Sequence, residues 1–197
     1  MQTRPIFQLG TLGLLALLLT IPYELFAQQS ASDVLRIRRL EGDLVRAPQY
    51  QVRGGQSAQR QRQWLQVRTE FQTAPEWIDE VTFTYYIVLR NRRPAEGEQE
   101  FNLFRGESSY INVARSRDGQ STVFLHPSTV ERFGELFRVG VVVTSQGRVL
   151  AMESSPSADG RWWEQLTPRS GLVLTRRHTP FAMINFDDFE ASPLPER

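Results

Sequence analysis

Side chains that could carry out chemistry are sparse in this chain. It has two histidines, His126 and His178, and no cysteine. Both histidines stand in loop-like settings, and no Gly-x-Ser-x-Gly elbow marks a nucleophilic serine for a Ser-His-Asp triad. Without cysteine there is no thiol nucleophile, Cys-based zinc site or redox pair. We therefore expect both histidines to hydrogen-bond backbone in turns, and we predict that the protein is not an enzyme.

Carboxylates gather in two short stretches, residues 76–80 and 187–190. They are Glu76, Asp79 and Glu80 in the first stretch and Asp187, Asp188 and Glu190 in the second. Clustered carboxylates suit Ca²⁺ or Mg²⁺, but the second stretch lacks EF-hand spacing. A glycosidase needs two carboxylates held across a cleft, which a cluster before a strand does not provide. We interpret the stretches as a polar loop and a solvated tail, and expect neither a metal ion nor a cofactor.

Three tryptophans are the candidate ligand or partner surface: Trp77, Trp162 and Trp163. Flat aromatic side chains can stack on sugar rings, and adjacent residues of a strand point to opposite faces. One member of the Trp162–Trp163 pair would then be exposed. Tryptophan is also large core material. The sequence leaves both interpretations open: an aromatic rim that binds a glycan or another ligand, or side chains buried in the core.

The first residues resemble a secretory signal. Arg4 is followed by an apolar run over residues 9–21, then by Pro22 and the small residue Ala27. A membrane-spanning helix needs about 20 apolar residues, which this run does not reach. We predict a signal peptide over residues 1–27 and a location in the periplasm or on the outer surface. An uncleaved N-terminal anchor is the alternative, and the absence of cysteine excludes a lipoprotein anchor.

The charge and length of the mature chain, which would begin near Gln28, limit the classes of partner that it could bind. All 23 basic residues are arginine, 22 residues are acidic, and the net charge is +1. This balance gives no electrostatic case for nucleic-acid binding. No stretch inside the mature chain is apolar enough to span a membrane. The chain is long enough to bury one sizeable core without disulfides.

Strand-like patterns dominate the mature chain. The strongest is Val81–Leu89, in which odd positions form one apolar row of β-branched and aromatic residues. Trp64–Phe71 also alternates, with apolar residues at odd positions. Further strands are predicted at Val34–Leu40, Gln49–Arg53, Gln99–Phe104, Ser109–Arg115, Ser121–Leu125, Leu136–Val143, Arg148–Glu153, Gly171–Arg176 and Ala182–Phe186.

Turn and cap signals separate these strands. Asp118-Gly119 predicts a hairpin turn, and Gln146-Gly147 is a weaker signal of the same kind. Ser128, with Glu131 three residues later, forms a capping-box pattern that predicts one short helix over residues 128–133. Residues 161–166 fit either a helical turn or a strand.

Many short strands at roughly ten-residue spacing, with little helix, predict an all-β fold. We expect an immunoglobulin-like antiparallel β-sandwich over residues 64–186. An N-terminal arm with short strands precedes it over residues 28–63, and an acidic tail follows over residues 187–197.

Several stretches resemble the pilus-like proteins of certain Gram-negative bacteria. The stretches that carry the resemblance are Trp64–Val67, Pro75–Tyr86, Val123–Phe133, Trp162–Trp163 and Thr179–Ala182. The resemblance implies an exported protein with an immunoglobulin-like fold, often encoded near type IV pilus genes, and it supplies no catalytic residues. The N-terminus differs from that of major type IV pilins, because the fifth residue after Gly10 is Leu15 rather than glutamate. A conventional fibre-forming pilin is therefore not expected.

Two functions follow as hypotheses. The first is a structural or interaction protein of the cell envelope, which joins a pilus-associated or envelope partner, or itself, by strand addition at an exposed sheet edge. The second is an adhesion module that binds a glycan or another ligand through the aromatic rim. Clustered exposed tryptophans would favour the second hypothesis, and buried tryptophans with a free sheet edge would favour the first.

Overall fold

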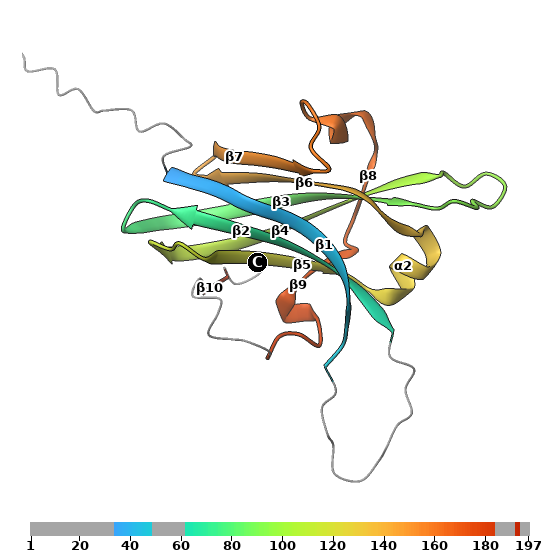
Figure 1. Ribbon diagram of the computed structural model, residues 1–197, viewed down its shortest axis with the longest axis horizontal. Coiled ribbons are helices and arrows are strands. Elements are labelled where there is room, and N and C mark those ends of the chain that lie inside the picture. The colour runs from blue at the N-terminus through green and yellow to red at the C-terminus, as the bar shows by residue number, and fades with distance from the viewer. Residues whose placement is uncertain (1–33, 49–61, 184–191, 194–197) are drawn as a thin grey trace, which may run out of the picture.

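The computed structural model describes residues 34–48, 62–183 and 192–193, which form two β-sheets packed face to face (Figure 1). The four-stranded sheet has the order β1 (Leu35–Arg46), β2 (Gln63–Thr73), β5 (Gly119–Leu125) and β9 (Val173–Thr175). The six-stranded sheet has the order β10 (Ser192–Pro193), β4 (Phe101–Ala114), β3 (Trp77–Arg90), β6 (Glu135–Ser145) and β7 (Arg148–Ser155), with β8 (Pro168–Ser170) also beside β4. The predicted signal peptide and the predicted Gln49–Arg53 strand lie outside these residues. Within them, no helix is both long and apolar enough to cross a membrane.

Strand β3 lies at the centre of the six-stranded sheet, between β4 and β6. Its odd residues form one fully buried row, as the Val81–Leu89 pattern predicts. They are Val81, Phe83, Tyr85, Ile87 and Leu89. The facing row on β2 contains the buried residues Leu65, Val67 and Phe71, so the predicted alternation there is also confirmed. Both rows belong to one apolar core between the sheets, which confirms the all-β sandwich.

Two tyrosines of the six-stranded sheet form hydrogen bonds across the core to one serine of the other sheet. The Tyr85 hydroxyl donates to the Ser121 backbone carbonyl at 3.0 Å, and the hydroxyls of Tyr110 and Ser121 lie within hydrogen-bond distance, at 3.1 Å. All three residues are buried. Burial raises the pKa of the Tyr85 phenol well above its usual value, and nearby Tyr110 adds to the effect. These bonds satisfy polar groups that would otherwise be costly in an apolar core.

Two sequence predictions, about β4 and about the turn that follows it, are wrong. The strands predicted over 99–104 and 109–115 are one continuous strand, because β3 pairs along nearly all of β4. Gly106 does not interrupt this strand; its missing side chain leaves room for Val173, whose Cβ would lie 2.4 Å from an added Cβ. The Asp118-Gly119 turn is not a hairpin turn, since β4 pairs with β3 whereas β5 pairs with β2. The chain changes sheets there.

The Gln146-Gly147 hairpin is confirmed. Ser145 pairs with Arg148, which leaves two residues in the turn. Both have positive φ, 48° for Gln146 and 77° for Gly147. Positive φ at both central positions is the type I′ geometry that matches the twist of antiparallel strands.

The short helix predicted over residues 128–133 is confirmed, but Ser128 does not cap it. Helix α2 spans Pro127–Phe133, and His126 is the N-cap residue. The Nδ1 atom of His126 accepts the backbone N–H of Ser128 at 3.2 Å. Proline at the first helical position starts the helix one residue before the predicted cap, because its fixed φ suits that place. At the other end, the Gly134 N–H donates to the Val130 carbonyl.

Both ends of the described chain differ from the sequence interpretation. The strand predicted over 34–40 continues to Arg46, and it pairs with β2 along its whole length apart from one bulge at Arg38. Residues 180–183 form a turn where a strand was predicted, and the rest of that predicted strand is not described. In the predicted acidic tail, Ser192 and Pro193 pair with β4.

The raised pKa of Tyr85 predicts how stability responds to alkali. The phenol of an unfolded chain titrates at about pH 10, whereas the folded one titrates higher. The free energy of unfolding therefore keeps its full value below about pH 10 and falls above it, because the unfolded state alone releases the proton. The chain has neither lysine nor cysteine, so tyrosines are the side chains that titrate in this range. Urea unfolding between about pH 9 and pH 11 should show this loss, at up to about 1.4 kcal/mol per pH unit.

The Tyr85→Phe variant separates this effect from general alkaline damage. It should lose about 1 kcal/mol at neutral pH, from the missing hydrogen bond, and show a flatter alkaline decline. Tyr86→Phe, on the outer face of the same strand, is the matched control and should keep the steep decline. An equally steep decline in Tyr85→Phe would contradict the assignment.

Candidate interaction surface

Trp162 and Trp163 cover the outer face of the six-stranded sheet. Trp163 is 4% exposed and stacks on Tyr86, with ring centroids 4.6 Å apart and planes 10° apart. Trp162 is half-buried, and its Nε1–H donates to the Ser154 hydroxyl at 2.9 Å. Both begin the 3-10 helix η1 (Trp162–Gln165), which settles the choice between helical turn and strand. The pair therefore forms a second, smaller cluster with Val88, Leu103 and their neighbours.

A bare backbone position on β6 makes this packing possible. A Cβ built on Gly140 would lie 2.7 Å from Trp163 and 3.1 Å from Trp162. Real side chains do not approach so closely, so the rings occupy the space that any other residue would fill. This is why two large aromatic side chains can pack directly over a strand.

Trp77 lies elsewhere. It is 61% exposed and begins β3, nine residues before Tyr86 on the same strand. At about 3.3 Å per residue, roughly 30 Å separate it from the Trp162–Trp163 pair. The structure therefore does not gather the three tryptophans into one surface, and only Trp77 is widely exposed among them.

An aromatic cluster that the sequence analysis missed covers the outer face of the four-stranded sheet. Phe181 stacks on Phe124 with centroids 4.7 Å apart, and Trp64 meets Phe181 edge-on at 5.9 Å. His126 also lies against Trp64, with centroids 4.9 Å apart. The sequence does contain a sign of this cluster. Trp64 is an apolar residue at an even position of β2, where the alternation requires an outward side chain. Only a covering segment makes that position buried.

Both histidines have local structural contacts. His126 accepts a backbone N–H as the helix cap, and its Nδ1 lies 2.7 Å from the Ser128 hydroxyl. His178 Nδ1 lies 3.2 Å from the Thr175 hydroxyl, beside the 3-10 helix η2 (Arg176–His178). The backbone role expected for a turn histidine is thus observed at His126.

The predicted carboxylate stretches show no metal-binding geometry where the structure describes them. Glu76, Asp79 and Glu80 are exposed around the start of β3. In the described part of the chain, no group of three His, Cys, Asp or Glu side chains could hold a metal ion. The 187–190 stretch lies outside it.

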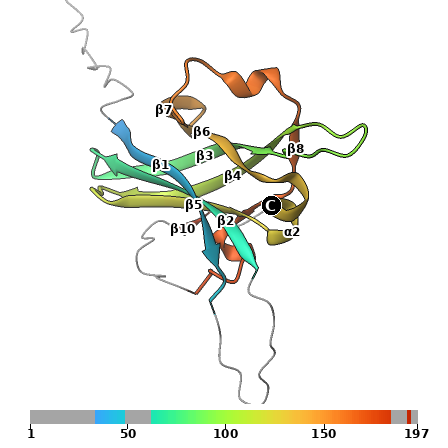
Figure 2. The same ribbon diagram turned by 45° about the vertical axis from the view of Figure 1, so that its right-hand side comes forward.

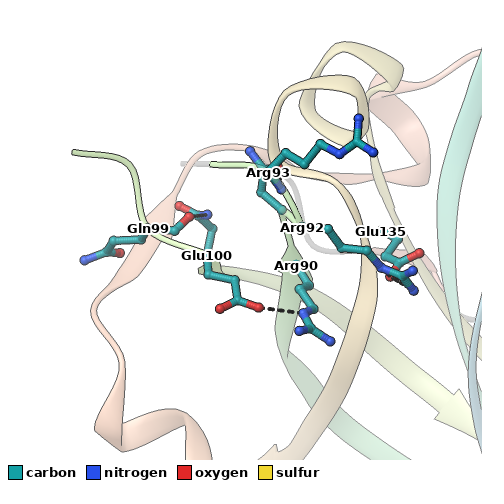
Figure 3. A network of polar contacts seen from close by, with 8 residues as sticks. Arg90, Arg92, Arg93, Gln99, Glu100 and Glu135 are labelled. Atoms are coloured by element: carbon teal, nitrogen blue, oxygen red, sulfur yellow. Dashed lines mark hydrogen bonds and ion pairs between the residues drawn. The ribbon is translucent and has the colours of Figure 1, made fainter. Parts of the chain in front are cut away.

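The hairpin between β3 and β4 projects beyond both sheets in each view (Figures 1 and 2). Its base carries exposed ion pairs, Arg90 with Glu100 at 2.7 Å and Arg92 with Glu135 at 2.5 Å (Figure 3). The second pair ties the hairpin to the start of β6. Exposed pairs of this kind contribute about 1 kcal/mol or less each, so they orient the hairpin more than they stabilise the fold.

The aromatic clusters cover part of each outer face, and the sheet edges are further candidate contact sites. On one side, β4 is flanked by β8 at residues 103–105 and by β10 at residues 110–111. On the other side lie the long strands β1 and β7. In the described residues, each of these pairs with one strand only.

The two free edges differ in charge. Strand β1 exposes Arg36, Arg38 and Arg39, and a bulge interrupts its pairing at Arg38. Further along, Glu41 accepts from Arg39 and Arg68, and its hydrogen bond raises the pKa of Arg68. Bulges and charges are devices that protect an edge from unwanted pairing. Strand β7 exposes one arginine and one glutamate, Arg148 and Glu153, beside two apolar side chains, Val149 at 41% and Met152 at 45%.

Comparisons with known proteins agree with this architecture. A family model of pilus-like proteins matches residues 26–193. A crystal structure of a protein from Akkermansia muciniphila superposes with a TM-score of 0.70 and 21% sequence identity, covering 83% of this chain and 94% of that chain. At this identity the likeness shows the fold alone. A search of the curated proteins finds no significant match.

The close approach of both tryptophan rings to Gly140 gives a test of their packing. Gly140→Ala should displace both rings, because the added Cβ would overlap them. We expect a loss of about 1–3 kcal/mol in the free energy of unfolding and a red shift of tryptophan fluorescence. Thr144→Val, on the same strand, is the control and should preserve the native emission. Native fluorescence and stability in Gly140→Ala would contradict the packing described.

Proposed function

Since the chain belongs to a family of pilus-like proteins, we propose that it is an exported structural and interaction protein of the cell envelope. It associates with pilus or secretion components, or with the cell surface. A finer proposal, on the resemblance over residues 64–186, is a link to a type IV pilus system. The family match carries the proposal, and the free edges of β1 and β7 supply a physical means of association.

The alternative, a glycan-binding module with an aromatic rim, has less support. Trp163 is buried, Trp162 is half-buried, and Trp77 lies far from both. A platform for a sugar ring would rest on Trp77 alone. The partner is therefore proposed to be a protein that meets a strand edge.

Export is tested with a reporter that folds only outside the cytoplasm. Residues 1–40 are fused to an enzyme that needs disulfides for activity, since these form in the periplasm. We expect activity in living bacteria, and N-terminal sequencing of the exported full chain should begin near Gln28. Deletion of residues 9–21 is the control and should abolish activity. An inactive fusion, with the full chain in the cytoplasmic fraction, would contradict export.

Association is tested by photo-crosslinking in the bacterium that makes the protein. A photoreactive residue replaces Leu44 on β1 or Met152 on β7, both of which are exposed. We expect covalent adducts with envelope or pilus proteins, or with a second copy, identified by mass spectrometry. Met183, which is exposed and belongs to neither strand, is the control position and should give no such adduct.

Two results would overturn this assignment. Adducts of equal yield at position 183 would show that the edges have no special role. Glycan binding that Trp77→Ala abolishes, without any protein adduct at positions 44 and 152, would favour the adhesion module.

A further inference from the structure

The outer edge of β7 has a pattern that is complementary to itself. The pairing of β7 with β6 shifts between Val143 and Thr144, because Val149 pairs with Thr144 and Ala151 with Val143. Leu150 is thus an extra residue, a β-bulge. It is buried, at 7% exposure, and so points to the core like its neighbour Ala151 opposite Val143. Two successive side chains therefore share the inner face.

With the bulge, the inner and outer faces to which residues 148–153 point follow a symmetrical order. Val149 and Met152 pair with Thr144 and Val142, which both lie on the outer face of β6. Glu153 pairs with the core residue Val141, and Arg148 pairs with Ser145, which shares a face with Val143. From residue 148 to residue 153 the order is inner, outer, inner, inner, outer, inner. This order is the same in both directions.

We propose that β7 pairs antiparallel with β7 of a second copy about a two-fold axis, which joins two six-stranded sheets. The inference rests on the proposed function and names the partner for this edge. Residues whose numbers sum to 301 lie opposite each other, and every pair shares a face. Arg148 meets Glu153 of the second copy, Val149 meets Met152, and Leu150 meets Ala151. The two-fold axis repeats each pair.

Charge and exposure support this register. Arg148 and Glu153 are exposed and opposite in sign, and opposite charges across a strand pair are stabilising. Val149 and Met152 are the two exposed apolar residues of the strand, and each covers the other. The same two-fold operation on β1 would bring together two strands with four arginines and two acids each, and like charges repel.

The bulge is compatible with this pairing. A regular strand matches the faces of β7 by opposing one residue to both Leu150 and Ala151, as β6 does with Val143. An identical β7 carries an identical bulge, so it matches every face with one residue opposite one residue.

Charge reversal tests the pairing in the full mature chain. Sedimentation velocity over a range of concentrations should show a dimer for the wild type. Glu153→Arg or Arg148→Glu alone places like charges opposite each other twice, and each should raise the dimer dissociation constant about tenfold or more. The double variant Arg148→Glu/Glu153→Arg restores opposite charges and should restore the dimer. Glu96→Arg, on the projecting hairpin, is the control and should dimerise as the wild type does.

Cysteine pairs test the register, because the chain has no cysteine of its own. Directly opposite residues have Cα atoms about 4.5–5.5 Å apart, within the range a disulfide spans. Val149→Cys/Met152→Cys should therefore oxidise to a covalent dimer. Each single variant should not, since equal residues are offset by three positions, about 10 Å.

The outcomes separate this inference from the proposed function. A wild-type chain that stays monomeric, or a dimer unaffected by Glu153→Arg, overturns the β7 pairing. Envelope adducts at positions 44 or 152 would still support the interaction role in that case. A dimer that the single reversals weaken and the double reversal restores supports the pairing, whatever other partners the chain has.

Discussion

The hydrogen bonds of Tyr85 and Tyr110 with Ser121 are the constraint on which the sandwich depends. Apolar contacts have no preferred direction, but a buried hydroxyl must meet its acceptor. Tyr85 and Tyr110 come from adjacent strands of one sheet, and Ser121 comes from the other. The bonds therefore fix how the two sheets align. A slip of β5 by one residue would turn Ser121 away from both tyrosines and bring Thr122 or Gln120 into the core.

This alignment also determines where the protein can meet a partner. Each sheet has an aromatic cluster on its outer face, Trp64 with Phe124 and Phe181 on one, and Trp162 with Trp163 on the other. The 3-10 helix η1 brings Trp162 and Trp163, and the turn after η2 brings Phe181, so neither face is a flat open surface. The tryptophans stabilise the sandwich from outside. The edges and the charged hairpin between β3 and β4 are the candidate contact sites.

The sequence predicts what local chemistry decides and misses what distant pairing decides. Alternation identifies β3 because its odd residues from Val81 to Leu89 face one core. The Gln146-Gly147 pair identifies the turn after β6, where both residues have positive φ. By contrast, Asp118-Gly119 indicates a reversal of the chain but not which sheet the next strand joins. Proline at position 127 moves the helix cap to His126, against the Ser128 capping-box signal. The site is harder still: Trp162 and Trp163 are indistinguishable from an exposed rim until Gly140 is known to lie beneath them.

Leu150, the extra residue of β7, packs in the core although it belongs to an edge strand. If Leu150 were removed, Val149 would still lie opposite Thr144 and Ala151 opposite Val143, so every remaining side chain would keep its face. The bulge therefore adds one buried side chain without changing which residues the edge exposes. Bulges on edge strands are usually a defence, since they twist the edge away from an incoming strand. In the two-fold pairing of β7, the second copy carries the same bulge at the facing position, so the residue pairs on both sides of the axis keep matching faces.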